Sequence, residues 1–282
     1  MARPHGRVAI ITGCSSGIGY TTALYLARRG IHVYATMRDP SKATPLLEEG
    51  RRARLPLEVL KLDVTVEGDI VEAVSRVVGE RGRLDVLINN AGFGLLGPVE
   101  EVSTEELRAQ FETNFFGHVR LIQEVVPIMR RQGSGYIVNI SSAAGRIAVP
   151  FMGAYSAAKF ALEGLSEALH HELTPYGIKV VIIEPGYIHT NFHRNVRVAA
   201  KAQRESSPYA ALMKRTAGGQ RSHLLRGSGP EKVAKIIYKA ISSEKPRLRY
   251  TAGRDAWMGT LFQRLLPERL FLWAIRRYYG LK

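Results

Sequence analysis

A short apolar segment runs directly into a glycine-rich turn near the beginning of the chain. Residues 7–12 read R-V-A-I-I-T, which is typical of a buried strand, and Gly13, Gly17 and Gly19 follow in the string T-G-C-S-S-G-I-G. Glycine lets the backbone turn sharply and approach another group closely, and a helix after the turn offers free amides and the positive end of its dipole. The pattern predicts a strand–turn–helix unit that binds a dinucleotide phosphate, although its G-x-x-x-G-x-G spacing differs from the common G-x-G-x-x-G.

Apolar strand candidates alternate with helical patterns along the rest of the chain. A helix is expected to follow the glycine turn and to end at Gly30, and further helices are expected around residues 67–80, 103–131, 153–175 and 230–243. Such alternation predicts parallel βαβ units in an α/β, doubly wound sheet of about seven strands, with helices on both faces. The expected strands are residues 7–12, 32–36, 57–62, 84–89, 135–140, 179–184 and 248–251.

Length and composition suit one globular domain over residues 1–282. Hydrophobic residues make up 45% of the chain, without an N-terminal signal pattern or an apolar run of 18 residues, so no transmembrane helix is predicted. The single cysteine, Cys14, excludes an intrachain disulfide, and we expect a cytoplasmic protein. The net charge of +15 leaves two interpretations open, an anionic partner or a basic surface without a specific role.

Tyr155 and Lys159 lie four residues apart in Y-S-A-A-K, and Ser142 precedes the tyrosine by thirteen residues. On a helix, residues four apart share a face, so the lysine ammonium would lie near the tyrosine hydroxyl. A nearby positive charge favours the phenolate and lowers the pKa of a phenol from its usual ~10, which suits a general acid or base. Ser142 could hydrogen-bond the same substrate oxygen. On spacing alone an ordinary solvated helix face is the commoner interpretation, so the surrounding motifs must decide whether these residues form a catalytic set.

Those motifs resemble the short-chain dehydrogenase/reductase family, in the order that the family shows and from Val8 to about Tyr250. Within the family, the strings A-T-M-R-D-P and K-P-R-L-R-Y are most similar to the branch of 17-beta-hydroxysteroid and retinol dehydrogenases. The resemblance implies a Rossmann-like fold and hydride transfer between a nicotinamide cofactor and a carbonyl or alcohol. The motifs are T-G-C-S-S-G-I-G, Leu62-Asp63-Val64, Asn89-Asn90-Ala91-Gly92, T-N-F-F-G with Asn114, the set Ser142, Tyr155 and Lys159, and Pro185-Gly186 with Thr190.

The resemblance also implies a role for each matching residue. Tyr155 would exchange a proton with the substrate oxygen, Lys159 would lower the pKa of the tyrosine and bind the nicotinamide ribose, Ser142 would hold the oxygen, and Asn114 would support a water chain. No metal site is implied. The cofactor-binding set is Gly13, Ser15, Ser16, Gly17, Ile18, Gly19, Arg38, Asp63, Val64, Asn90, Ala91, Gly92, Tyr155, Lys159, Pro185, Gly186, Ile188 and Thr190.

The end of the second strand distinguishes the two nicotinamide cofactors. An acid usually binds the ribose 2′-hydroxyl of NAD there, but by the family's alignment this position is Thr36, and Arg38 follows. A guanidinium pairs well with a phosphate, so NADP is expected. Asp39 keeps NAD open, because its carboxylate could offset Arg38 or bind the hydroxyl.

Three segments bear on the substrate. Residues 188–229 form the expected substrate loop and lid, whose excess of arginine and lysine either attracts an anionic substrate or faces water. Residues 253–282 form a C-terminal extension, in which Trp257, Met258, Leu261, Phe262 and Leu265 recur at helical spacing. That amphipathic helix could cover the cleft, dock on a partner subunit or lie on a membrane. An apolar pocket is expected from Phe93, Leu95, Val149, Phe151, Met152 and Tyr187.

The branch favours a bulky, apolar alcohol or ketone, of steroid, retinoid or lipid type. One alternative is a reductase of an anionic or carrier-linked 3-oxoacyl substrate. Two other classes stay open: an NADP-binding regulator without catalysis, and a nucleic-acid binder suggested by charge alone, for which no recognised motif is present. Family resemblance suggests a homodimer or homotetramer.

Overall fold

Seven parallel strands form the central sheet, in the order β3-β2-β1-β4-β6-β7-β9. The computed structural model describes residues 6–216 and 227–281. The order reverses between β1 and β4, which makes the sheet doubly wound, as the alternating pattern predicted. The strands are β1 (Val8–Ile11), β2 (His32–Met37), β3 (Leu57–Lys61), β4 (Val86–Asn89), β6 (Gly135–Ile140), β7 (Ile178–Pro185) and β9 (Arg249–Ala252), with a small separate pair of β5 (Leu95–Leu96) and β8 (Arg197–Val198).

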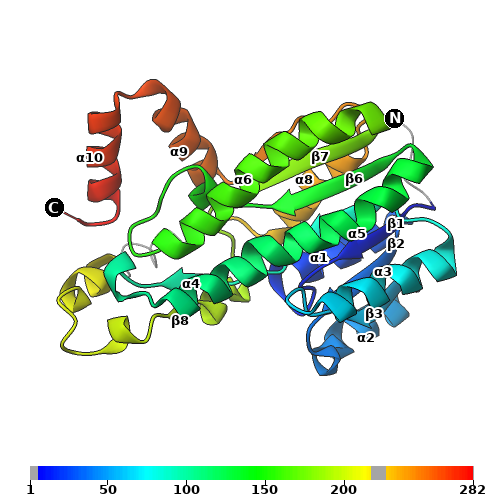
Figure 1. Ribbon diagram of the computed structural model, residues 1–282, viewed down its shortest axis with the longest axis horizontal. Coiled ribbons are helices and arrows are strands. Elements are labelled where there is room, and N and C mark those ends of the chain that lie inside the picture. Colours follow the sequence, from blue (N-terminus) through cyan, green and yellow to red (C-terminus); the bar gives the residue numbers. More distant parts are fainter. Residues whose placement is uncertain (1–5, 217–226, 282) are drawn as a thin grey trace.

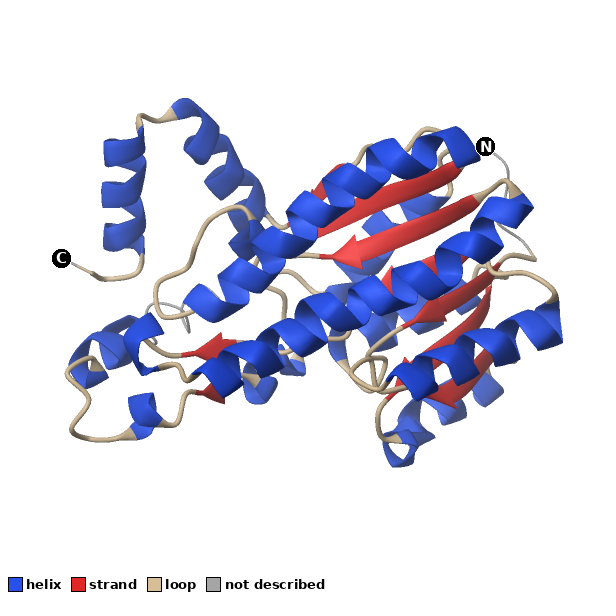
Figure 2. Ribbon diagram, in the orientation of Figure 1, coloured by secondary structure: helices blue, strands red, loops and turns tan. Residues whose placement is uncertain are grey.

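Helices cover both faces of the sheet, because the strands are apolar on both sides. Helices α1, α2 and α8 pack on one face, where Leu24 and Ile237 join the apolar core, and α3, α5 and α6 pack on the other, where Val74 and Leu121 do so (Figures 1 and 2). The helices are α1 (Gly17–Ala27), α2 (Thr44–Arg52), α3 (Glu67–Arg81), α4 (Thr104–Phe111), α5 (Gly117–Gln132), α6 (Gly153–Leu173), α8 (Pro230–Ile241), α9 (Arg254–Leu265) and α10 (Glu268–Tyr278).

The structure differs from the expected helices in three places, and the pair of β5 and β8 was not expected. Helix α2 was not predicted, and a π-helical turn at Glu112–Phe116 divides the helix expected over 103–131 into α4 and α5. The tail forms two helices instead of one, because Pro267 cannot continue α9 and caps the start of α10. None of the helices within the described residues is long and apolar enough to cross a membrane.

The parallel arrangement brings the carboxyl ends of the strands to one edge of the sheet. Their arrowheads point toward the side on which the lid segments and the tail gather (Figure 2). A buried chain of side-chain hydrogen bonds ties this edge to α6: Asn89 donates to Asn139 at 2.9 Å, Asn139 donates to Ser166 at 2.8 Å, and Ser166 donates to the carbonyl of Leu162 at 2.6 Å. The helix that carries Tyr155 is therefore fixed against β4 and β6.

Candidate active site

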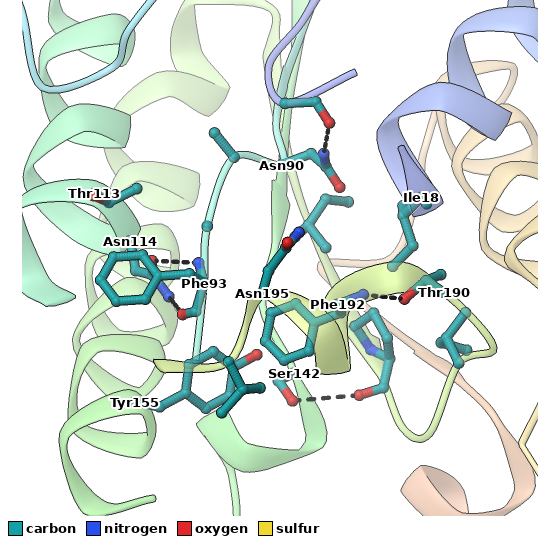
Figure 3. Close-up of a pocket in the computed structure, with 18 of the residues that line it drawn as sticks. Ile18, Asn90, Phe93, Thr113, Asn114, Ser142, Tyr155, Thr190, Phe192 and Asn195 are labelled. Atoms are coloured by element: carbon teal, nitrogen blue, oxygen red, sulfur yellow. Dashed lines mark hydrogen bonds between the residues drawn. The ribbon is translucent and has the colours of Figure 1, made fainter. Parts of the chain in front are cut away.

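A cavity of about 900 Å³ lies at the carboxyl edge of the sheet. All four predicted catalytic residues line it, and Figure 3 shows three of them labelled, Asn114, Ser142 and Tyr155. The predicted cofactor residues line it too, except Gly19. The motifs that are far apart in the sequence therefore meet in one space large enough for a dinucleotide and a substrate.

The glycine turn after β1 has the backbone that its composition predicted. Gly13 and Gly17 have φ values of +71° and +61°, which other residues adopt only with strain. A side chain on Gly19 would place its Cβ 2.4 Å from the carbonyl oxygen of Gly13. Gly19 therefore allows the turn to close on itself and does not line the cavity.

A threonine that the sequence analysis did not single out holds this turn against the loop after β4. The Thr12 hydroxyl accepts hydrogen bonds from the backbone amides of Asn90 and Ala91, both at 2.9 Å. In return the side-chain amide of Asn90 donates to the carbonyl of Thr12 at 2.8 Å. In the sequence, this role could have been predicted only from the hydroxyl side chain of Thr12 directly before the first glycine of the turn, Gly13.

The turn and the start of α1 fit the pyrophosphate of a dinucleotide. Helix α1 begins at Gly17, and its cap residue Ser16 makes no side-chain hydrogen bond to the helix. The first amides of α1 therefore keep their capacity to donate to an anion, next to the positive end of the helix dipole. Ser15, Ser16 and Ile18 lie on the cavity wall beside them.

Two cations flank the place where β2 ends. Arg38 and Lys42 both line the cavity, and the Arg38 side chain is 70% exposed, with its Nε 4.0 Å from Asp63 Oδ2. The Asp39 carboxylate accepts hydrogen bonds from the backbone amide and the hydroxyl of Ser41, at 3.1 and 2.6 Å. These bonds hold the pKa of Asp39 below its usual range. Asp39 itself is not among the residues that line the cavity. Lys42 was missed because it follows the strand by five residues.

Tyr155 and Ser142 lie next to one another on the opposite wall (Figure 3). Burial raises the pKa of the Tyr155 phenol to about 12, and a hydrogen bond with the Ser142 hydroxyl acts in the lowering direction. Ser142 also accepts from the backbone amide of Ala144 at 3.1 Å. The lowered tyrosine pKa expected from Lys159 is not what the structure shows, because the effect of burial is larger.

Lys159 lies one turn further along α6 and is also buried. Its Nζ donates to the carbonyl of Ile140 at 2.7 Å and lies 5.8 Å from the centre of the Tyr155 ring. Burial lowers the pKa of Lys159 to about 8, against the opposing charge of Glu163. Glu163 follows at the next turn and accepts from Arg249 Nε at 2.9 Å. Lys159 is thus a buried cation whose charge depends on its neighbours near neutral pH.

Asn114 occupies the π-helical turn, a feature frequent at functional sites. Its amide donates to the carbonyl of Phe93 at 2.9 Å and its oxygen accepts from the amide of Phe93 at 3.1 Å (Figure 3). One turn later His118 bonds the carbonyl of Ala91 through Nε2, at 2.8 Å. Burial lowers the pKa of His118 to about 3, so this buried imidazole is neutral. The two side chains hold the loop after β4 from beneath.

The remaining residues that are predicted to bind the cofactor line two sides of the cavity. Asp63, Val64, Ala91 and Gly92 line the cavity on one side, and Pro185, Gly186, Ile188 and Thr190 line it beyond β7.

Two of the predicted pocket residues do not line the cavity. Leu95 points into a small core with Ala154 and Ala199, and since successive strand residues face opposite sides, Leu96 faces the cavity instead. Phe151 adopts a φ of +61°, and its ring contacts Tyr209 at a centroid distance of 6.3 Å. Phe93, Val149, Met152 and Tyr187 do line the cavity.

Lid and tail residues supply walls that no motif indicated. Phe192 lies 5.8 Å from the Tyr155 ring, centre to centre, and Asn195 also faces the cavity, as does Thr113 of the T-N-F-F-G string (Figure 3). Tyr279, just beyond α10, reaches the cavity and hydrogen-bonds Tyr187. The tail thus covers part of the cleft, one of the three alternatives left open.

The basic lid contributes one described cation to the cavity wall. The guanidinium of Arg197 lies 4.3 Å from the centre of the Phe93 ring. Arg221 and Arg226, which also belong to the expected basic lid, lie outside the described residues.

Comparison with known proteins finds relatives along most of the chain. The family model described as short chain dehydrogenase matches residues 7–201. The 3-ketodihydrosphingosine reductase of Bacteroides thetaiotaomicron is 37% identical, over 98% of this chain and 99% of its own. The 17-beta-hydroxysteroid dehydrogenase type 1 of Homo sapiens is 37% identical over 86% of this chain and 76% of its own, and retinol dehydrogenase 8 of Bos taurus is 38% identical over 86% and 80%.

Solved structures agree with this relationship. A short-chain dehydrogenase from Streptomyces avermitilis has a TM-score of 0.81 and 37% identity, over 92% of each chain. A relative from Burkholderia phymatum, solved with NAD, has a TM-score of 0.80 at 25% identity, over 94% of this chain and 95% of its own. A metagenomic oxidoreductase, solved with NADP, has a TM-score of 0.70 at 26% identity, over 88% and 96%.

Replacing Thr12 by valine should destabilise the turn. The change keeps the shape but leaves the amides of Asn90 and Ala91 without their acceptor, which costs about 1–3 kcal/mol for each amide. Urea denaturation measures the free energy of unfolding. Thr22→Val is the matched control, because the buried Thr22 hydroxyl has no partner within the described residues, and it should change that energy by less than about 0.5 kcal/mol. Equal effects of the two variants would contradict the role of Thr12.

Proposed function

The chain is an oxidoreductase of the short-chain dehydrogenase family, and on that premise we propose that it interconverts a ketone or aldehyde and an alcohol with NADP(H), with Tyr155 as the general acid and base. The observation that carries the proposal is one cavity with two kinds of wall. One wall is the glycine turn with the start of α1, and the other bears Ser142, Tyr155 and Lys159. When bound, the nicotinamide supplies or accepts the hydride.

The side chains manage the proton at the substrate oxygen. Because its pKa is about 12, Tyr155 is protonated at neutral pH and is ready to donate to an alkoxide that forms during reduction. The Ser142 hydroxyl lies within hydrogen-bonding reach of the phenol, so its single proton can turn to the same substrate oxygen once a substrate is bound. The buried Lys159 ammonium stabilises the negative charge that Tyr155 acquires when the proton leaves.

Arg38 and Lys42 support a preference for NADP. A 2′-phosphate between these two cations would gain charge-assisted hydrogen bonds, and Arg38 can bind it through two N–H groups. Thr36 at the end of β2 is fully buried, and the Asp39 carboxylate is engaged with Ser41, so neither favours the free 2′-hydroxyl of NAD.

A large apolar substrate with one reactive oxygen suits the other end of the cavity. Phe93, Leu96, Val149, Met152 and Phe192 provide apolar walls, and the tail closes part of that end. Three relatives are named for a ketodihydrosphingosine, a hydroxysteroid and retinol, each of which has a large hydrocarbon part and an oxygen function.

A substrate with an acidic group is the second candidate, and Arg197 on the cavity wall favours it. A screen of NADPH oxidation with long-chain ketones, steroid ketones, retinal and 3-oxoacyl thioesters separates the two. Faster turnover of the thioesters, lost in Arg197→Ala, would select the second candidate.

Tyr155→Phe should abolish turnover without releasing the cofactor. Loss of a positioned general acid lowers rates by about 10²–10⁴-fold. Steady-state NADPH oxidation measures kcat. A fluorescence titration should give an NADPH Kd within about twofold of the parent, because only the hydroxyl is removed. Tyr176→Phe, at an exposed tyrosine, is the control. Near-normal turnover in Tyr155→Phe would refute the mechanism.

The double variant Arg38→Ala/Lys42→Ala should lose its preference for NADP. Removing two charge-assisted contacts should weaken NADPH by about tenfold to hundredfold and leave NADH nearly unchanged. The ratio of kcat/KM values for the two cofactors reports the effect. Arg51→Ala, an exposed arginine at the end of α2, serves as the control. An unchanged ratio in the double variant would refute the cofactor assignment.

The rate of carbonyl reduction should fall above pH 8. Lys159 loses its proton as the pH rises through about 8, while Tyr155 stays protonated up to about 12, so kcat/KM should decline about tenfold per pH unit above 8. Glu163→Gln removes the charge that raises the pKa of Lys159 and should move this decline to lower pH. Glu167→Gln, the exposed neighbour that also binds Arg249, should move it less. A decline that begins only above pH 10 in the parent would contradict the prediction.

A further inference from the structure

The tail helices α9 and α10 expose an apolar surface. We call it the tail patch: Trp257, Met258, Phe262 and Leu265 on α9, with Leu272 and Trp273 on α10. Both tryptophans are more than half exposed, at 57% and 56%, and Leu265 is 69% exposed. Large exposed apolar areas on a folded protein mark a contact with a partner or a lipid.

The rest of the protein packs against other residues of the tail and leaves the tail patch exposed. Ala256 and Thr260 of α9 are buried, and the Gln263 amide donates to the carbonyl of Arg146 at 2.7 Å. Phe271 and Tyr279 anchor α10. The two helices stand out from one end of the molecule in Figure 1, so their remaining face is accessible.

The tail carries more cations than acids. The described tail has two acids, Asp255 and Glu268, and the Asp255 carboxylate accepts from the backbone amide of Tyr187 at 2.6 Å. The Arg277 guanidinium lies 5.5 Å from the centre of the Trp273 ring, so positive charge and apolar area are adjacent. The arginines of the tail are Arg254, Arg264, Arg269, Arg276 and Arg277.

We propose that the tail patch docks on a lipid membrane that contains anionic phospholipids. Tryptophan, phenylalanine and leucine enter the boundary between headgroups and acyl chains, and arginines pair with lipid phosphates. Helices of 12 and 11 residues are too short to cross a bilayer, so they lie in its surface. A second copy of this chain is disfavoured as the occupant, because it would bring the same excess of arginine to the contact.

Docking here would bring the cavity to the membrane. Tyr279 lies immediately after α10 and forms part of the cavity wall, so the patch and the wall belong to one continuous segment. An apolar substrate dissolved in the bilayer would then reach Tyr155 with little exposure to water. The proposal that the tail patch docks on a membrane is independent of the proposed function, whereas the delivery of substrate from the bilayer to Tyr155 rests on that function.

Flotation of the full-length protein with phosphatidylcholine vesicles, with and without phosphatidylglycerol, tests the proposal. The protein should float with the anionic vesicles, remain mostly free of the neutral ones, and dissociate as salt is raised, since salt screens the arginines. A bound fraction that is the same with and without anionic lipid, and at low and high salt, would overturn the proposal.

A charge-matched pair of triple variants locates the contact. Trp257→Glu/Leu265→Glu/Trp273→Glu should lower the bound fraction by at least about tenfold. Val66→Glu/Val71→Glu/Tyr176→Glu changes three exposed apolar residues away from the tail and should lower it far less. Circular dichroism confirms folding without reference to activity, so failure of the proposed function leaves the test intact. Equal losses of vesicle binding in both variants would overturn the proposal. It would also be overturned if the parent protein did not bind vesicles and instead formed a dimer that only the tail variant disrupts.

Discussion

The hydrogen bonds between Thr12 and the loop after β4 are the contact on which the site depends. Parallel strands β1 and β4 end side by side, so the chain segments that leave them must pass at van der Waals distance. Gly13 makes this approach possible, because a Cβ there would lie 2.9 Å from the Cα of Ala91. The Thr12 hydroxyl then satisfies two amides that the sheet leaves unpaired. The cofactor wall and the loop that Asn114 supports are thereby joined.

Burial is the second constraint, and it acts in opposite directions on the two titratable groups of α6. It raises the pKa of Tyr155 to about 12 and lowers that of Lys159 to about 8, which favours the neutral form of each. The charge of Glu163, which Arg249 helps to keep ionised, opposes the effect of burial on the lysine, and the Lys159 ammonium donates to the carbonyl of Ile140. A tyrosine that holds its proton beside a cation that stabilises its anion is suited to proton donation.

Local patterns were sufficient for the sheet. All seven strands appear within two residues of the expected ends, because a strand buried on both faces is a short apolar run bounded by turns. Patterns failed where neighbours distant in sequence decide. Leu95 resembles Leu96 in every local respect, but only the latter faces the cavity. Phe151 is turned toward Tyr209 by a positive φ, which a phenylalanine rarely adopts and which the local sequence does not predict.

The sequence by itself determined the class of fold, the family and the positions of the residues that we propose to be catalytic, because glycine spacing, strand alternation and the Ser142, Tyr155 and Lys159 set are encoded by neighbours along the chain. Only the tertiary structure decided the charge states and the walls. The pKa of a buried group follows from what surrounds it in space, so Arg249 and Ile140 matter to Lys159 across 90 and 19 residues of sequence. Likewise, Tyr279 reaches the cavity only because Pro267 breaks the tail and lets α10 fold back.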